Sequence, residues 1–220
     1  MPLSLPITLA AILSYLSILV IVLAGLSGIM RFRQVSSGLR VVAILTIFEL
    51  PLELLGEFLM LTNRSNLFLM PIYTIGELGL LALLYHRTLE SSTFTRWIPW
   101  AVGLFTIYTI FDSLLGPGLH WFRPWQQILQ SLLILLMVGL YFLKLLNELR
   151  VKRLTREPMF WVSTGLLIYF LGYLQIALFS NYLLQHYSVQ FNRNVWLVHT
   201  LLSIVLHSCY CLALWMRPQR

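Results

Sequence analysis

The chain has 220 residues, of which 59% are hydrophobic and 10% are charged, and its formal net charge is +7. Soluble domains carry about 25% charged residues, so this composition, with a mean hydropathy of +0.81, excludes an ordinary soluble domain and indicates an integral membrane protein. The positive charge does not indicate nucleic-acid binding, because the basic residues are grouped at the ends of apolar blocks.

Seven apolar blocks are each long enough to cross a membrane, since a spanning helix needs about 20 mostly apolar residues. In chain order they cover residues 7–30, 41–62, 67–89, 97–115, 125–146, 158–184 and 195–216. Tryptophan prefers the membrane interface, and the tryptophans lie near block ends: Trp97, Trp100, Trp121, Trp125, Trp161, Trp196 and Trp215. The sequence therefore predicts an all-α integral membrane protein, a single seven-transmembrane-helix bundle over residues 1–220.

The basic residues divide unevenly between the two predicted sides of the membrane. One side carries Arg31, Arg33, Arg40, Arg87, Arg96, Lys144, Arg150, Lys152, Arg153, Arg156, Arg217 and Arg220. The other side has only Arg64, Arg123 and Arg193. Because short basic loops stay cytoplasmic, we expect an N-terminus outside, a cytoplasmic C-terminus and a multi-pass protein of the inner (plasma) membrane.

The most basic segment follows the fifth block and contains Arg150, Lys152, Arg153 and Arg156. Such a segment is attracted to anionic lipid on the cytoplasmic face. This is the favoured interpretation, and docking of a cytoplasmic protein partner is the alternative.

The second block carries three glutamates at a spacing of four: Glu49, Glu53 and Glu57. Residues spaced by four drift only about 40° around a helix, so the three share one broad face. Ionisable residues inside a membrane are costly and typically mark a functional site. Pro51 lies between the first two and predicts a kink, because proline removes a backbone donor inside a helix. We therefore expect this face to point into the bundle.

Further polar residues lie at comparable predicted depths, and most of them lie in the outer half. They are Glu77 and His207 near the midplane, and Asp112, Gln175 and His199 in the outer half. The cytoplasmic half is nearly free of such groups, and no buried lysine or arginine is expected to balance the acids. This distribution predicts a polar pocket that opens outward and binds a small ligand, a cation or a proton.

The two histidines predict separate polar pairs rather than one metal site. His199 and His207 are eight residues apart, about 12 Å along a helix, whereas two ligands of one zinc lie only about 3–4 Å apart. We expect His207 to pair with Glu53 or Glu77, and His199 to pair with Glu57 or Asp112. The sequence predicts no metal site and no cofactor.

Three functions are compatible with these residues. The leading hypothesis is a sensor or partner subunit that binds a small ligand or cation from the outer side. A lipid-modifying or lipid-hydrolysing intramembrane enzyme is the first alternative, weakly favoured by Ser203, four residues before His207. A proton- or cation-coupled carrier is the second.

The segments Leu67–Leu89, Phe160–Leu174 and Val195–Trp215 are similar to small seven-helix proteins of bacterial inner membranes. That resemblance implies the seven-helix fold and the inner-membrane location. The family has no assigned activity, so the resemblance implies no catalytic residue.

Overall fold

The computed structural model describes residues 7–62, 64–115, 123–148 and 154–216. The elements in these ranges are α1 (Ile7–Arg31), α2 (Ser37–Leu61), η1 (Leu67–Leu69), α3 (Met70–Leu89), α4 (Ser92–Leu115), α5 (Pro124–Glu148), η2 (Leu154–Arg156), α6 (Pro158–His186) and α7 (Val189–Trp215). All of these elements are helical, and the described residues contain no strand. The predicted all-α class is confirmed.

Six described helices, all except α2, are long and apolar enough to cross a membrane. The α2 helix is equally long at 25 residues, but it carries Arg40, Glu49, Glu53 and Glu57. Helix bounds agree with the predicted blocks to within a few residues, except that α7 begins six residues before the predicted block 195–216. There Ser188 accepts a hydrogen bond from the Phe191 amide and caps the helix.

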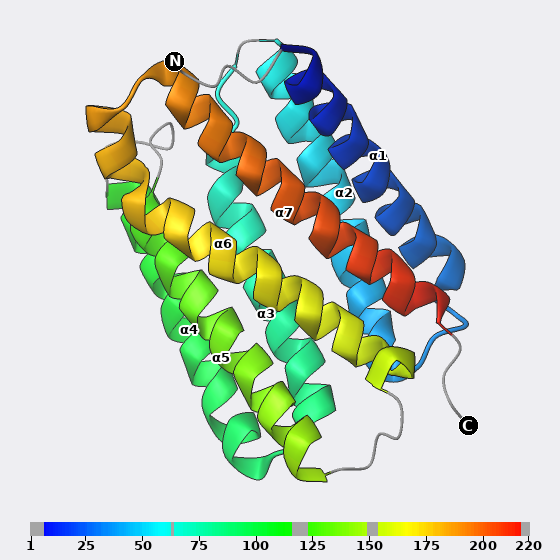
Figure 1. The fold of residues 1–220 in the computed structure, drawn as a ribbon. Coiled ribbons are helices and arrows are strands. Elements are labelled where there is room, and N and C mark those ends of the chain that lie inside the picture. The colour runs from blue at the N-terminus through cyan, green and yellow to red at the C-terminus, as the bar shows by residue number, and fades with distance from the viewer. Residues whose placement is uncertain (1–6, 63, 116–122, 149–153, 217–220) are drawn as a thin grey trace.

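Six of the helices form a ring, and the seventh packs outside it (Figure 1). Around the ring, α1 packs against α2, α2 against α3, α3 against α5, α5 against α6, α6 against α7, and α7 against α1. The outer helix, α4, packs mainly on α3. A further contact between α2 and α7 crosses the ring. This crossing contact divides the interior, and it positions the candidate site.

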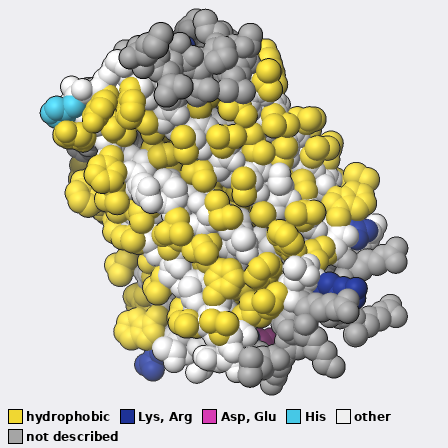
Figure 2. Space-filling model, in the orientation of Figure 1, with side chains coloured by type: hydrophobic (Ala, Val, Ile, Leu, Met, Phe, Trp, Pro, Cys, Tyr) yellow, Lys and Arg dark blue, Asp and Glu magenta, His cyan; other side chains and the backbone are white. Residues whose placement is uncertain are grey.

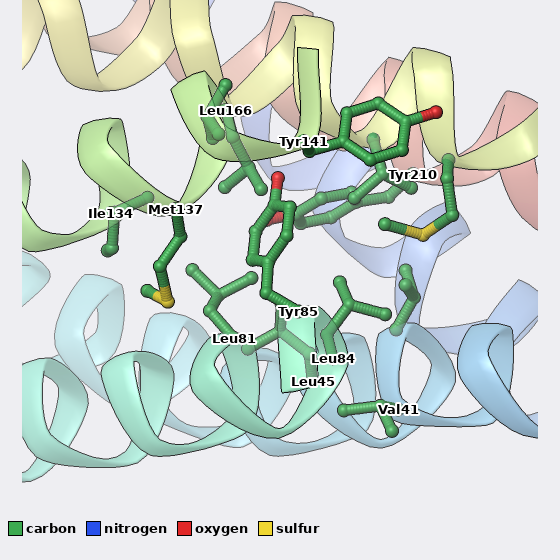
Figure 3. Close-up of a cluster of buried hydrophobic side chains, with 14 of the residues drawn as sticks. Val41, Leu45, Leu81, Leu84, Tyr85, Ile134, Met137, Tyr141, Leu166 and Tyr210 are labelled. Atoms are coloured by element: carbon green, nitrogen blue, oxygen red, sulfur yellow. The ribbon is translucent and has the colours of Figure 1, made fainter. Parts of the chain in front are cut away.

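The two ends of the bundle differ in character. The end where α2 leads into α3 and α6 into α7 is called the polar end here; the end where α1 leads into α2 and α3 into α4 is called the basic end. Large apolar side chains fill the interior toward the basic end, including Leu45, Leu81, Tyr85, Met137 and Tyr210 (Figure 3). Within this core the Tyr85 hydroxyl hydrogen-bonds that of Ser163 at 2.9 Å.

Hydrophobic side chains also cover the outer surface of the helices (Figure 2). On α4 they include Leu104, Ile107 and Leu114, each more than half exposed. A protein with apolar residues on both its core and its surface is suited to lipid rather than water. The structure therefore supports a multi-pass membrane protein.

Cationic side chains at the basic end bind the carboxyl ends of helices. The Lys144 ammonium donates to the backbone oxygens of Thr88 and Leu89 at 2.9 and 3.0 Å. The Arg31 side chain donates to the Leu214 oxygen at 3.3 Å and lies 5.1 Å from the centre of the Trp215 ring. These cations complement the partial negative charge of helix C-termini. Of the basic segment predicted to dock a partner, Arg150, Lys152 and Arg153 lie outside the described residues, and Arg156 ends η2 with an exposed side chain.

Candidate functional site

A cavity of about 390 Å³ lies inside the ring toward the polar end. Five helices enclose it: α2, α3, α5, α6 and α7. Its wall carries two carboxylates, Glu53 and Glu77, and the ring of His199. Five aromatic residues also line it: Tyr73, Tyr169, Phe170, Tyr173 and Trp196. The cavity is therefore acidic and aromatic, and it extends to Asn66 and Leu67 in the connection at the polar end.

A second, smaller chamber of about 130 Å³ lies between α1, α2 and α7. Its polar lining consists of Ser14, Ser17, Glu53, Glu57, His199, Thr200 and Ser203. Glu53 and His199 line both spaces. These two residues therefore stand in the wall that separates the smaller chamber from the larger cavity, at the crossing of α2 and α7.

A hydrogen bond from α5 holds the Glu77 carboxylate in the larger cavity. The Gln130 side-chain amide donates to Glu77 Oε2 at 2.7 Å, and the Gln127 amide donates to Thr74 Oγ1 at 3.3 Å. Both glutamines lie one turn apart on α5 and are buried. Gln130 orients Glu77 from the neighbouring helix without neutralising its charge, because an amide is uncharged, and Gln127 contacts Thr74 one turn before Glu77 on α3.

Glu49 lies deeper than either cavity and has no exposed surface. Its Oε2 lies 3.5 Å from His207 Nε2, an ion-pair distance, and neither carboxylate oxygen makes a hydrogen bond of normal geometry with a described residue. Glu49, Glu53 and Glu77 are also close enough for their charges to interact. A buried carboxylate is costly without a partner, so His207 is the main compensation that the described residues offer to Glu49.

The protons of His207 can be placed from its contacts. Its Nδ1 lies 2.8 Å from the Ser203 backbone oxygen, which can only accept, so Nδ1 carries a proton. The Ser203 hydroxyl lies 3.3 Å from the same nitrogen. A protonated nitrogen cannot take the serine proton, so this geometry does not activate Ser203 as a nucleophile. With that proton on Nδ1, a neutral His207 would point the lone pair of Nε2 at the lone pairs of Glu49 Oε2. A second proton between Nε2 and Oε2 removes this repulsion.

His199 contacts Tyr169 rather than an acid. Its Nε2 lies 3.0 Å from the Tyr169 hydroxyl, and its ring packs against Tyr173 and Trp196 at centroid distances of 5.0 and 5.6 Å. The structure thus gives both histidines partners other than those predicted: Glu49 for His207, and Tyr169 for His199. The partner of His207 lies one turn from the predicted Glu53 on the same helix, whereas the partner of His199 lies on α6, a different helix from either predicted one.

Two predicted site residues lie away from both cavities. Asp112 pairs with Arg123 at 2.9 Å and accepts from the Gln126 amide at 2.7 Å. The Arg123 side chain is only 10% exposed, which corrects the expectation that no buried cation balances the acids. Gln175 is exposed on α6. The structure therefore gathers Glu49, Glu53, Glu57, Glu77, His199 and His207, and leaves Asp112 and Gln175 outside.

Several lining residues were not predicted as site residues. The aromatic wall and the two α1 serines carry no charge, so hydropathy does not distinguish them from lipid-facing residues. The spacing of Ser14 and Ser17, three residues apart on an apolar helix, is the one signal that could have indicated a polar stripe on α1.

No three His, Cys, Asp or Glu side chains gather in a metal-binding group within the part of the chain that the structure describes. Comparison of the chain with protein-family models, with curated proteins and with solved structures finds no match. The two cavities are therefore the features of this protein that indicate a function.

Proposed function

We propose that this protein spans a bacterial-type inner membrane seven times and binds a small organic cation, from the outer side, in the larger cavity. It would act there as a sensor or as a subunit of a larger assembly. One observation carries the proposal: a cavity of about 390 Å³ holds the carboxylates of Glu53 and Glu77, and no lysine or arginine among the described residues lines it. A cationic ligand would supply the missing positive charge.

Charge balance supports a cation over an anion or a neutral molecule. Moving a carboxylate out of water is costly unless a proton or a counter-charge accompanies it. The negative charges of Glu53 and Glu77 repel each other, and the charge of Glu49 repels both. An anion would add to this repulsion, whereas a cation would relieve it.

The aromatic wall supports an organic cation over a bare ion. Aromatic faces attract alkylammonium groups, and a ring of them recognises quaternary ammonium ligands in other proteins. Here Tyr73, Tyr169, Tyr173 and Trp196 surround the space beside the two carboxylates. A small molecule with a charged ammonium head and a short apolar body could pair with the carboxylates and pack against the aromatic rings.

Seven spans are supported by the position of α2. A helix of 25 residues is about 37 Å long, and α2 packs between α1, α3 and α7. Its most buried acid, Glu49, faces the interior rather than lipid. The uneven distribution of Arg and Lys supports an N-terminus outside and a cytoplasmic C-terminus.

Cysteine labelling tests this topology. In a background with Cys209→Ala and Cys211→Ala, we expect a membrane-impermeant maleimide to label Ser65→Cys in intact cells. We expect Ser36→Cys to be labelled only after the cells are opened. Both serines are exposed and lie at opposite ends of α2. Labelling of both residues from one side would contradict a spanning α2, and the reversed pattern would contradict the orientation.

The alternative functions receive different support. A serine hydrolase built on Ser203 and His207 is disfavoured, because the nitrogen next to the serine already carries a proton that it donates to a backbone oxygen. A cation-coupled carrier is favoured by one observation, the wall of Glu53 and His199 shared by two cavities. Liposomes that contain the protein would separate carrier from sensor by testing for uptake.

The ligand class is tested with choline and its uncharged carbon analogue, 3,3-dimethyl-1-butanol. We expect choline, and not the alcohol, to raise the melting temperature of the purified protein in lipid nanodiscs. In Glu77→Gln we expect the choline affinity to fall at least tenfold, about 1.4 kcal/mol, because one carboxylate of the cavity is lost while its hydrogen bond to Gln130 can be retained.

The matched control is Glu90→Gln. It removes an acid of the same type at the basic end, where the side chain is 80% exposed, and we expect wild-type choline affinity. Equal responses to choline and to the alcohol would contradict the proposal, as would unchanged affinity in Glu77→Gln.

A further inference from the structure

Polar residues line the smaller chamber at helical spacing on all three of the helices that form it. Each helix contributes a pair of polar residues spaced three or four apart: Ser14 and Ser17 from α1, Glu53 and Glu57 from α2, Thr200 and Ser203 from α7, which adds His199 as a third. This spacing places both members of a pair on one helix face. Three polar faces therefore converge on one space of about 130 Å³.

Two groups of this chamber lack a partner. The Ser17 side chain is more than nine-tenths buried, at 9% exposure, and its hydroxyl makes no hydrogen bond with a described residue. No cationic side chain of the described residues pairs with Glu57, whose charge is repelled by that of Glu53. Thr200 and Ser203 already have polar neighbours, the Trp196 oxygen and His207. The oxygens without a partner among the described residues therefore belong to Ser17 and Glu57.

We propose that this chamber binds a hard inorganic cation of the Na⁺ or Ca²⁺ type. Carboxylate and hydroxyl oxygens are the ligands that such cations prefer. Two carboxylates one turn apart supply up to two negative charges, and Ser14 and Ser17 supply neutral oxygens from the facing helix. The volume is about a third of that of the larger cavity, which suits an ion with a few waters and leaves the organic ligand to the other space.

The shared Glu53 couples the two sites. A cation in the chamber and an organic cation in the cavity would lie on either side of one carboxylate, and their charges would repel. The two ligands should therefore weaken each other's binding, by the same factor in both directions because linkage is reciprocal. This coupling rests on the proposed function, whereas the cation site itself does not.

Equilibrium dialysis with ⁴⁵Ca²⁺ and with ²²Na⁺ tests the site in the full chain in nanodiscs. We expect saturable binding of one of the two ions to the wild type. In Glu57→Gln and in Ser17→Ala we expect affinity for that ion to fall about tenfold or more, because affinity at oxygen sites follows ligand charge and number. Glu57→Asp keeps the carboxylate and should retain binding in part.

The matched control is Ser180→Ala. Ser180 is a buried helical serine whose hydroxyl bonds the Ala177 oxygen, away from the chamber, so this variant should bind the ion as the wild type does. Absence of saturable binding of either ion by the folded wild type would overturn the proposal. Wild-type affinity in both Glu57→Gln and Ser17→Ala would overturn it as well.

Choline affinity measured with and without the saturating ion tests the coupling. We expect the ion to weaken choline binding about fivefold or more, and Glu57→Gln to remove this effect while leaving choline binding intact. Ion binding without choline binding would refute the proposed function and retain the cation site. Choline binding without ion binding would refute the cation site and retain the proposed function. Binding of both ligands with no effect of one on the other would refute the coupling through Glu53.

Discussion

Replacing Glu49 with alanine is expected to lower the free energy of unfolding by about 3–5 kcal/mol, the usual cost of removing one partner of a buried ion pair. The carboxylate has no exposed surface and faces His207 Nε2 at 3.5 Å. Without it, the buried His207 Nε2 faces no polar partner among the described residues at the point where α2 crosses α7. Unfolding in SDS, followed by helical circular dichroism, measures the change.

Two further variants make this result specific to the pair. Glu49→Gln can still donate an amide hydrogen to His207 Nε2, so we expect it to lose clearly less stability than Glu49→Ala. A double-mutant cycle with His207→Ala should show strong coupling, because the second substitution removes the group that the first one leaves without a partner. Additive losses would show that the two residues act independently and would contradict the pair.

Replacing Gly28 with leucine is expected to force α1 away from α2 and to prevent normal packing of the bundle. A Cβ atom at Gly28 would lie 2.4 Å from Thr46 Oγ1 and 2.9 Å from the Ala43 backbone oxygen. Neither neighbour can move easily, because the Thr46 hydroxyl donates to that same oxygen at 3.0 Å. Overpacking of this kind costs about 1–3 kcal/mol for small additions, so Gly28→Ala should lose that much and Gly28→Leu more.

The control for Gly28 is Gly103→Ala on α4. No atom lies within 4 Å of a Cβ built there, and alanine is favoured over glycine inside a helix by about 1 kcal/mol. We therefore expect Gly103→Ala to keep or raise the melting temperature measured in detergent. Equal stability of Gly28→Ala and Gly103→Ala would contradict close contact between α1 and α2.

The two large effects both concern the packing of α2, Glu49 as one of its own residues and Gly28 as the α1 residue that faces it. The α2 helix is covered by α1 on one side and crosses α7 on the other, so it combines a close helix contact with a buried charge. Small residues allow helices in membranes to approach closely, and Gly25 and Gly28 present such a surface to α2. This close approach also brings Ser14 and Ser17 to the chamber that contains Glu53 and Glu57.

Much of the site could be listed from the sequence, but its grouping could not. The hydropathy pattern places a residue at a height along a helix axis, and it placed Glu53 and Glu77, which line one cavity, at one height near the midplane. It does not give the direction in which a side chain points around the axis. Gln175 at a suitable height is exposed on α6, and Asp112 turns to Arg123 and Gln126.

The amino-acid sequence by itself determined the class of protein and the acidic face of α2. Long apolar blocks and a 3.6-residue period are local properties, and they persist whatever the neighbouring helices do. Only the tertiary structure decided that His207 faces Glu49, that His199 faces Tyr169, and that Glu53 stands between two cavities. Those contacts depend on the rotation and the axial shift of each helix against its neighbours, which are set by packing between residues far apart in the chain.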